Sequence, residues 1–147
     1  MKIFGLFAIA FLNLLSCSSN KVQQETKQYI EKVTFQNWVG GIKGAGGGAI
    51  LNIDLLKSLP ENTQLIKIQF QEREGRITKL NNLKYQSSIK TFDNESETVP
   101  TDIIITNLNP NQAKIFFKIN GKEAIVIIDN VKELPMLANP SAKPKNN

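Results

Sequence analysis

The sequence predicts an all-β protein, either an antiparallel β-sandwich or a small β-barrel of about seven to eight strands. Much of the chain after residue 34 consists of short segments in which apolar and polar residues alternate, which is the period of a half-buried strand. Turn-forming residues separate these segments. No long segment has the period of an amphipathic helix, and a ferredoxin-like α+β fold would need two such helices.

The first two strands are expected in residues 35–56, around a glycine-rich segment. Leu51, Ile53 and Leu55 alternate with polar residues, and six of the nine glycines lie between Gly40 and Gly48. A glycine-rich loop can bind phosphate through its backbone amides, but this segment lacks the Gly-Lys-Ser/Thr of a P-loop and the final glycine of G-x-G-x-x-G. We therefore favour a hairpin bend in which glycine permits unusual backbone angles.

Two further strands are expected in residues 65–71 and 83–92, which show the same alternation. Residues 72–76 between them predict a charged turn, in which Gly75 would adopt positive φ. The two glutamates of that turn are interleaved with arginines, so a solvated ion network is a better interpretation than a catalytic carboxylate pair. Residues 93–97 are acidic at alternate positions, but they lack the glycine and final glutamate of a calcium loop and predict a loop.

The segment 113–129 gives the clearest structural signal, because Asn120-Gly121 is the preferred two-residue type I′ turn. A strand is also expected just before it, at residues 103–108. The turn sets a register that pairs Ile119 with Lys122, Lys118 with Glu123, Phe117 with Ala124, Phe116 with Ile125, and Ile115 with Val126. Both faces of this hairpin are apolar, so we expect it either at the centre of a sandwich or barrel or in contact with a partner or ligand.

The N-terminus predicts export. Lys2 precedes an apolar run, Ile3 to Leu15, which has the length of a signal-peptide core and is too short for a permanent membrane span. The run ends in Leu14-Leu15-Ser16-Cys17, which resembles the lipobox of bacterial lipoproteins. That resemblance implies cleavage before Cys17 and lipidation of Cys17. An ordinary secretory signal with an incidental cysteine is the alternative.

The wider pattern is similar to small lipoproteins of the Bacteroidetes kind: a lipobox, a polar spacer, Trp38-Val39-Gly40-Gly41, a glycine-rich turn and alternating strands. This resemblance brings no functional residues. The expected organisation is a lipoprotein signal peptide at 1–16, a lipidated cysteine and polar tether at 17–33, a β-domain at 34–134 and a flexible tail at 135–147. The end of the tether, Thr26 to Val33, could form one or two helical turns.

Composition excludes several kinds of chemistry. The chain has no histidine and one cysteine, so Ser-His and Cys-His catalysis in their standard forms are absent and the commonest metal ligand is missing. We therefore expect a non-enzymatic protein without a cofactor or metal. The formal charge of +5 comes from scattered lysines and arginines, which suits a soluble surface, and no nucleic-acid partner is expected.

The functional prediction is a membrane-anchored envelope lipoprotein that acts as a binding or structural module for an envelope protein or glycan. The predicted location is the outer membrane, facing the periplasm, with cell-surface display as the alternative. A surface-exposed module that binds glycan or protein would need an exposed aromatic platform, and the candidates are Trp38, Tyr85 and Phe116. A carboxylate-based hydrolase is the second alternative, and it would need two acids to converge, for example Asp54 and Asp102.

Overall fold

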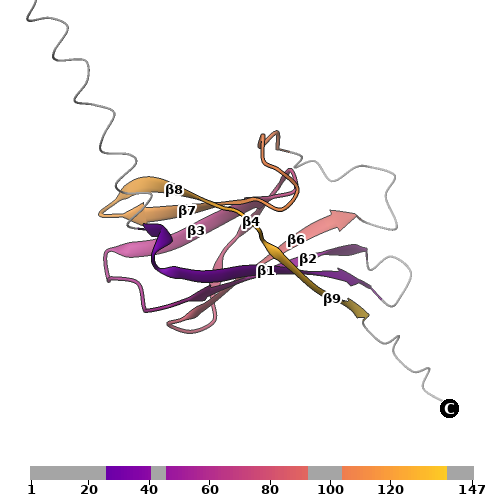
Figure 1. Ribbon diagram of the computed structural model, residues 1–147, viewed down its shortest axis with the longest axis horizontal. Helices are drawn as coiled ribbons and strands as arrows, with labels where there is room; N and C mark the ends of the chain where they lie inside the picture. The colour runs from indigo at the N-terminus through magenta and orange to yellow at the C-terminus, as the bar shows by residue number, and fades with distance from the viewer. Residues whose placement is uncertain (1–25, 41–45, 93–103, 139–147) are drawn as a thin grey trace, which may run out of the picture.

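The protein is a β-sandwich. The computed structural model describes residues 26–40, 46–92 and 104–138. Figure 1 shows the two sheets as separate layers, so the sandwich is confirmed and a closed barrel is not. The strands in this part of the chain are β1 (Ile30–Val39), β2 (Gly47–Leu55), β3 (Thr63–Phe70), β4 (Arg73–Arg76), β5 (Thr78–Lys79), β6 (Lys84–Phe92), β7 (Ala113–Ile119), β8 (Lys122–Ile128) and β9 (Lys132–Ala138).

The strand order is β5-β6-β2-β1-β9 in the larger sheet and β4-β3-β7-β8 in the smaller one. Eight of the nine strands pair antiparallel with a neighbour, but β9 pairs parallel with β1. The fold therefore has more strands than the expected seven to eight and is not purely antiparallel. The exception arises because the chain crosses from β8 in one sheet to β9 at the edge of the other.

Alternation along the strands builds the core between the sheets. β2 buries Leu51, Ile53 and Leu55 on its inner side, while the residues between them face outward. Phe35 of β1 and Phe70 of β3 meet across the core, with ring centroids 4.9 Å apart. Burial of such apolar side chains is the main stabilising contribution to the fold.

The β7–β8 hairpin confirms the predicted turn and the predicted register. Asn120 and Gly121 both have positive φ, 50° and 79°, as a type I′ turn requires. The five expected residue pairs are all present. The inner face carries Phe117 and Val126, which are almost completely buried. The prediction that this hairpin lies at the centre of a sandwich is only partly right, because β7 lies inside its sheet but β8 is at the edge.

The predicted charged turn at residues 72–76 is wrong. The turn lies at Gln71 and Glu72, which have φ of 47° and 58°, and the next four residues form β4. Gly75 is buried in that strand and is not among the residues with positive φ. A Cβ at Gly75 would collide with Ser87 Oγ and would lie 2.9 Å from Ile89 Cγ1 of β6. Glycine is needed here because the two sheets approach closely.

The expected strand at 103–108 is also wrong over the part that the structure describes. Residues 104–108 form no strand, although the Ile104 amide donates a hydrogen bond to the Glu72 carbonyl. Ile105 is 85% exposed, and Asn107 has φ of 52°, which is incompatible with an extended strand. An apolar run therefore did not mean burial in this segment.

Both ends of the β-domain differ from the expected boundaries. β1 begins at Ile30, within the segment assigned to the tether, because it pairs with β2 as far as Leu55. β9 extends to Ala138, so residues 135–138 belong to a strand and not to the tail. Pro135 is tolerated because β9 is an edge strand with an irregular register at that point. The rest of the expected tail lies outside the described residues.

Candidate binding face on the five-stranded sheet

The outer face of the five-stranded sheet carries a continuous row of polar side chains. Register places Lys132 of β9 beside Thr34 of β1, Thr34 beside Asn52 of β2, and Asn52 beside Gln86 of β6. Successive residues of a strand point to opposite faces, and the neighbours of these residues face the core. The four polar side chains therefore share the outer face.

A groove of about 430 Å³ runs along the Lys132, Thr34 and Asn52 part of this row, with Gln86 beside it. Its lining residues are Lys32, Thr34, Asn52, Asp54, Leu80, Lys84, Tyr85, Lys132 and Leu134. Three lysines against one aspartate give the groove an excess of two positive charges at neutral pH. A groove of this charge favours an anionic ligand.

Only one of the three lysines has a carboxylate partner among the residues that the structure describes. Lys32 Nζ lies 3.3 Å from Asp54 Oδ2, in the middle of the face. Lys84 is opposite Asp54 in the register of β2 and β6 but is not within ion-pair distance of it, and Lys132 is on the other side of the face. Both lysines are exposed, and neither forms an ion pair in this part of the chain. The two ammonium groups are therefore free to bind a ligand.

The centre of the row supplies groups that both donate and accept hydrogen bonds. Gln86 Nε2 donates to Asn52 Oδ1 over 3.0 Å, which fixes the orientation of both amides. Each amide still has one unused N–H or more and free acceptor capacity. Thr34, which is 8% exposed, adds a hydroxyl at the bottom of the face. These groups are suited to polar ligands that carry hydroxyls.

Trp38 lies further along the same outer face. It pairs with Gly48 of β2, and a Cβ at Gly48 would lie 2.8 Å from Trp38 Nε1. The indole ring therefore covers a position that only glycine leaves open. The ring is half-buried, and Nε1 is buried without a hydrogen-bond partner. Of the three predicted aromatics, Trp38 is the one whose position in its strand points to the outer face of this sheet, while Tyr85 contributes to the lining of the groove from a buried position.

Tyr85 and Phe116 do not join Trp38 in one platform. Tyr85 pairs with Ile53 and points to the core side of the larger sheet, where burial raises the pKa of its hydroxyl. Phe116 lies on the outer face of the other sheet, 7% exposed, with Lys67 Nζ 4.6 Å from its ring centre. The three aromatics that the sequence offered as a platform therefore do not form one exposed surface.

Of the carboxylate pairs considered from the sequence, only Glu72 and Glu74 both lie within the described residues. Asp54 is bound to Lys32, and Asp102 lies outside those residues. Glu74 contacts Lys67 Nζ at 3.0 Å and Gln69 Nε2 at 2.9 Å, with Lys67 also over Phe116. Partial burial alone would raise the pKa of Glu74, but the hydrogen bonds from Gln69 and Lys67 and the charge of Lys67 together lower it. Glu74 is therefore ionised at neutral pH and acts as an ion-pair partner.

A second open cleft, of about 450 Å³, lies at one end of the core beside β3, β5 and β6. It is lined by Leu59, Pro60, Glu61, Thr63, Gln64, Leu65, Ile77, Lys79 and Tyr85. Glu61 is its only acid, so the cleft has no pair of carboxylates for acid–base catalysis. In the described ranges, no helix is long and apolar enough to cross a membrane, and no group of three or more candidate ligands could hold a metal ion.

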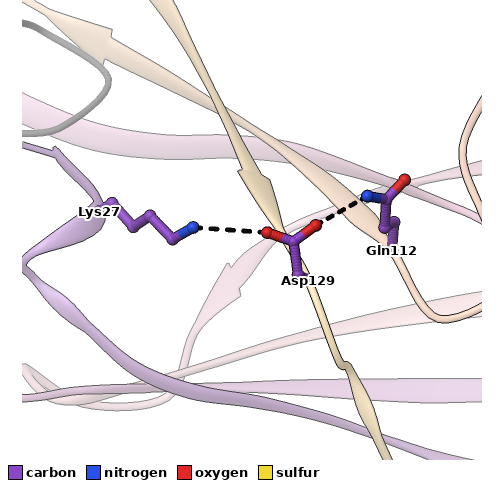
Figure 2. A network of polar contacts seen from close by, with 3 residues as sticks. All are labelled: Lys27, Gln112 and Asp129. Carbon is purple, nitrogen blue, oxygen red and sulfur yellow. Dashed lines mark hydrogen bonds and ion pairs between the residues drawn. The ribbon is translucent and has the colours of Figure 1, made fainter.

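Two polar contacts among three residues fix the point at which the chain enters the sandwich. Figure 2 shows the Asp129 carboxylate between Lys27, just before β1, and Gln112, just before β7. The distances are 3.6 Å to Lys27 Nζ and 2.7 Å to Gln112 Nε2. Asp129 follows β8, so this network ties the N-terminal turn to the crossover between the two sheets. Cys17 and the acidic segment 93–97 lie outside the described residues.

Comparison with known proteins found no family model, no curated protein and no solved structure that matches this chain. The alternation of residues 51–55 and 83–92 indicated which side chains point outward. It did not indicate that β1, β2, β6 and β9 lie side by side, and that order is what assembles Lys132, Thr34, Asn52 and Gln86.

Proposed function

We propose that this protein is a lipoprotein of the bacterial outer membrane, anchored through Cys17, whose β-sandwich is a non-enzymatic binding module in the periplasm. The observation that carries the binding role is the polar groove of the larger sheet, with two exposed lysines free to bind and hydrogen-bonding groups between them. A ligand-binding site typically combines a concave surface with a few placed polar groups in this way.

Support for the anchor comes from the lipobox, and a short stretch of chain joins Cys17 to the sandwich. Twelve residues separate Cys17 from Ile30, where β1 begins. An extended chain of this length reaches at most about 45 Å. A lipid on Cys17 would therefore hold the sandwich close to the membrane surface.

The anchor is tested with Cys17→Ser in membrane fractionation. The unmodified protein should remain with membranes after a high-salt wash, because lipid chains bind bilayers through apolar burial of about 0.8 kcal/mol per methylene. Cys17→Ser should become soluble. Ser18→Ala is the matched control, because it changes the neighbouring residue and keeps the cysteine. Cys17→Ser protein that stays in the membrane pellet would contradict the anchor.

Orientation is tested by protease treatment of intact cells, with a known periplasmic protein as the integrity control. Protection until the outer membrane is opened is the result expected for a periplasmic module. Digestion in intact cells would instead favour the alternative, a surface-exposed module that binds glycan or protein. Both outcomes leave the binding groove as the part of the domain to examine.

A further inference from the structure

We infer that the groove on the five-stranded sheet binds an acidic oligosaccharide, one whose sugar units carry carboxylates. The inference rests on the binding role proposed above and is independent of the anchor. It follows from three properties of the groove: the positions of its two unpaired lysines, the chemistry of the groups between them, and the central carboxylate of Asp54.

The positions of the lysines indicate an elongated ligand. Lys132 is on β9 and Lys84 is on β6, with β1 and β2 between them. Three strand spacings of about 4.8 Å place their backbones roughly 14 Å apart across the sheet. Side chains stand roughly perpendicular to a sheet, so a single phosphate or carboxylate would contact both ammonium groups only if both lysine side chains bent toward each other. A chain-like ligand with acidic groups at intervals can contact both without such bending.

The groups between the lysines favour hydroxyls over other ligand groups. Thr34 and Asn52 line the groove on the two strands between the lysines, and each offers both donors and acceptors. The hydrogen bond from Gln86, which lies on β6 beside the groove, holds the Asn52 amide in place. A sugar hydroxyl also donates and accepts, so each hydroxyl finds a complementary group on this row. Leu80 and Leu134 border the groove and offer apolar contact to the C–H faces of a sugar ring.

The carboxylate of Asp54 favours an acidic sugar over an acidic peptide as the ligand. Its carboxylate lies in the groove, with its side chain 23% exposed, and one oxygen is held by Lys32. A sugar hydroxyl can donate a hydrogen bond to the remaining acceptor sites of this carboxylate. A dense run of aspartates or glutamates would instead place like charges against it, which is unfavourable. The groove therefore favours a ligand that places a hydroxyl, and not an acid, at Asp54.

The test measures binding of an oligogalacturonate to the full-length protein in non-ionic detergent. Trp38 is the only tryptophan and lies on the same face, so its fluorescence reports binding, and calorimetry checks the affinity. The neutral probe is a cello-oligosaccharide of equal length, and the peptide probe is oligoglutamate. We expect the oligogalacturonate alone to bind tightly, with an affinity that falls as salt is added.

The decisive variant is Lys84→Gln with Lys132→Gln. Both side chains are exposed, so the fold should survive, and circular dichroism verifies this. We expect oligogalacturonate binding to weaken by about tenfold or more, because two charge-assisted hydrogen bonds are lost. The matched control is Lys118→Gln with Lys122→Gln, which removes the same charge from exposed positions on the β7–β8 hairpin. Binding by the control should change less than about twofold, since these residues do not line the groove.

Several results would overturn the inference. Failure of the unmodified protein to bind oligogalacturonate would do so, as would equal loss of binding in both double variants, which would mean unspecific charge attraction. An affinity for the neutral oligosaccharide equal to that for oligogalacturonate would show that the lysines do not bind the ligand. An affinity for oligoglutamate equal to that for oligogalacturonate would identify an acidic-peptide site. A protein that fractionates with membranes but fails these tests would leave the anchor standing and overturn only the ligand.

Discussion

Replacement of Gly75 by alanine should destabilise the sandwich because of one contact between the sheets. The new Cβ would collide with Ser87 Oγ and would lie 2.9 Å from Ile89 Cγ1. Overpacking of this kind typically costs about 1–3 kcal/mol. Alanine allows the unfolded chain fewer conformations than glycine does, and this effect offsets about 0.4–1 kcal/mol of the cost. The net expected loss in the free energy of unfolding is therefore about 1–2 kcal/mol, or roughly 5–10 °C in Tm.

Ser87 provides the test of the mechanism. Its hydroxyl is buried and has no hydrogen-bond partner among the residues that the structure describes, so Ser87→Ala alone should be neutral or stabilise by up to about 1 kcal/mol. Removal of Oγ also removes the nearest obstacle to a Cβ at Gly75. The Gly75→Ala, Ser87→Ala double variant should therefore be more stable than the sum of the single effects predicts, by about 1 kcal/mol.

Urea unfolding in the Cys17→Ser background, followed by circular dichroism and by Trp38 fluorescence, measures all four corners of this cycle. Two results would refute the reasoning. If Gly75→Ala unfolds at the same urea concentration as its parent, the sheets do not approach closely at this point. If the two substitutions are additive, the cost of the alanine arises somewhere other than at the Ser87 hydroxyl.

Two further predictions concern the aromatics of the core. Phe117→Ala should lower the free energy of unfolding by about 3–5 kcal/mol in urea, because the ring is fully buried. Phe116→Ala should lower it clearly less, because that ring is on the outer face beneath Lys67. Equal losses of stability in the two variants would contradict the assigned faces. Burial raises the folded-state pKa of Tyr85 above the unfolded value of about 10. The stability linked to this shift is therefore complete below the unfolded pKa and is lost as pH rises through the folded pKa. Stability measured from pH 8 to 11 should consequently fall less steeply in Tyr85→Phe, and parallel curves would argue against this burial effect.

Local signals in the sequence were sufficient for part of the fold. The Asn120-Gly121 turn fixes the register of β7 and β8 because a two-residue hairpin is determined by neighbouring residues. β9 depends on a partner far away in the chain, and Pro135 with its lack of alternation concealed it. Gly75 shows the same limit, since its requirement for glycine comes from Ser87 of the opposite sheet and not from its own turn.

The candidate binding face was less predictable than the fold. The outward positions of Asn52 and Gln86 follow from alternation, but a row across a sheet also requires strand order and register. Aromatic residues often form ligand platforms, which is why the sequence suggested Trp38, Tyr85 and Phe116. Tyr85 is buried in the core, and Phe116 lies on the other sheet. In the sequence, Lys84 and Lys132 are isolated charges typical of a surface. Only the strand order places them on the two sides of one groove.

The pairing of the first strand with the last constrains the order in which this chain can fold. Gln36 of β1 donates to the carbonyl of Pro135 in β9, 99 positions later in the sequence. Contacts between such distant residues close late, because a long loop must lose its freedom first. A chain that emerges with its N-terminus leading would complete β1, β2 and β6 while one edge of β1 still lacked its partner. An unpaired edge of this kind can recruit a strand from another chain, so β9 serves both as a structural strand and as the cover that ends this exposure.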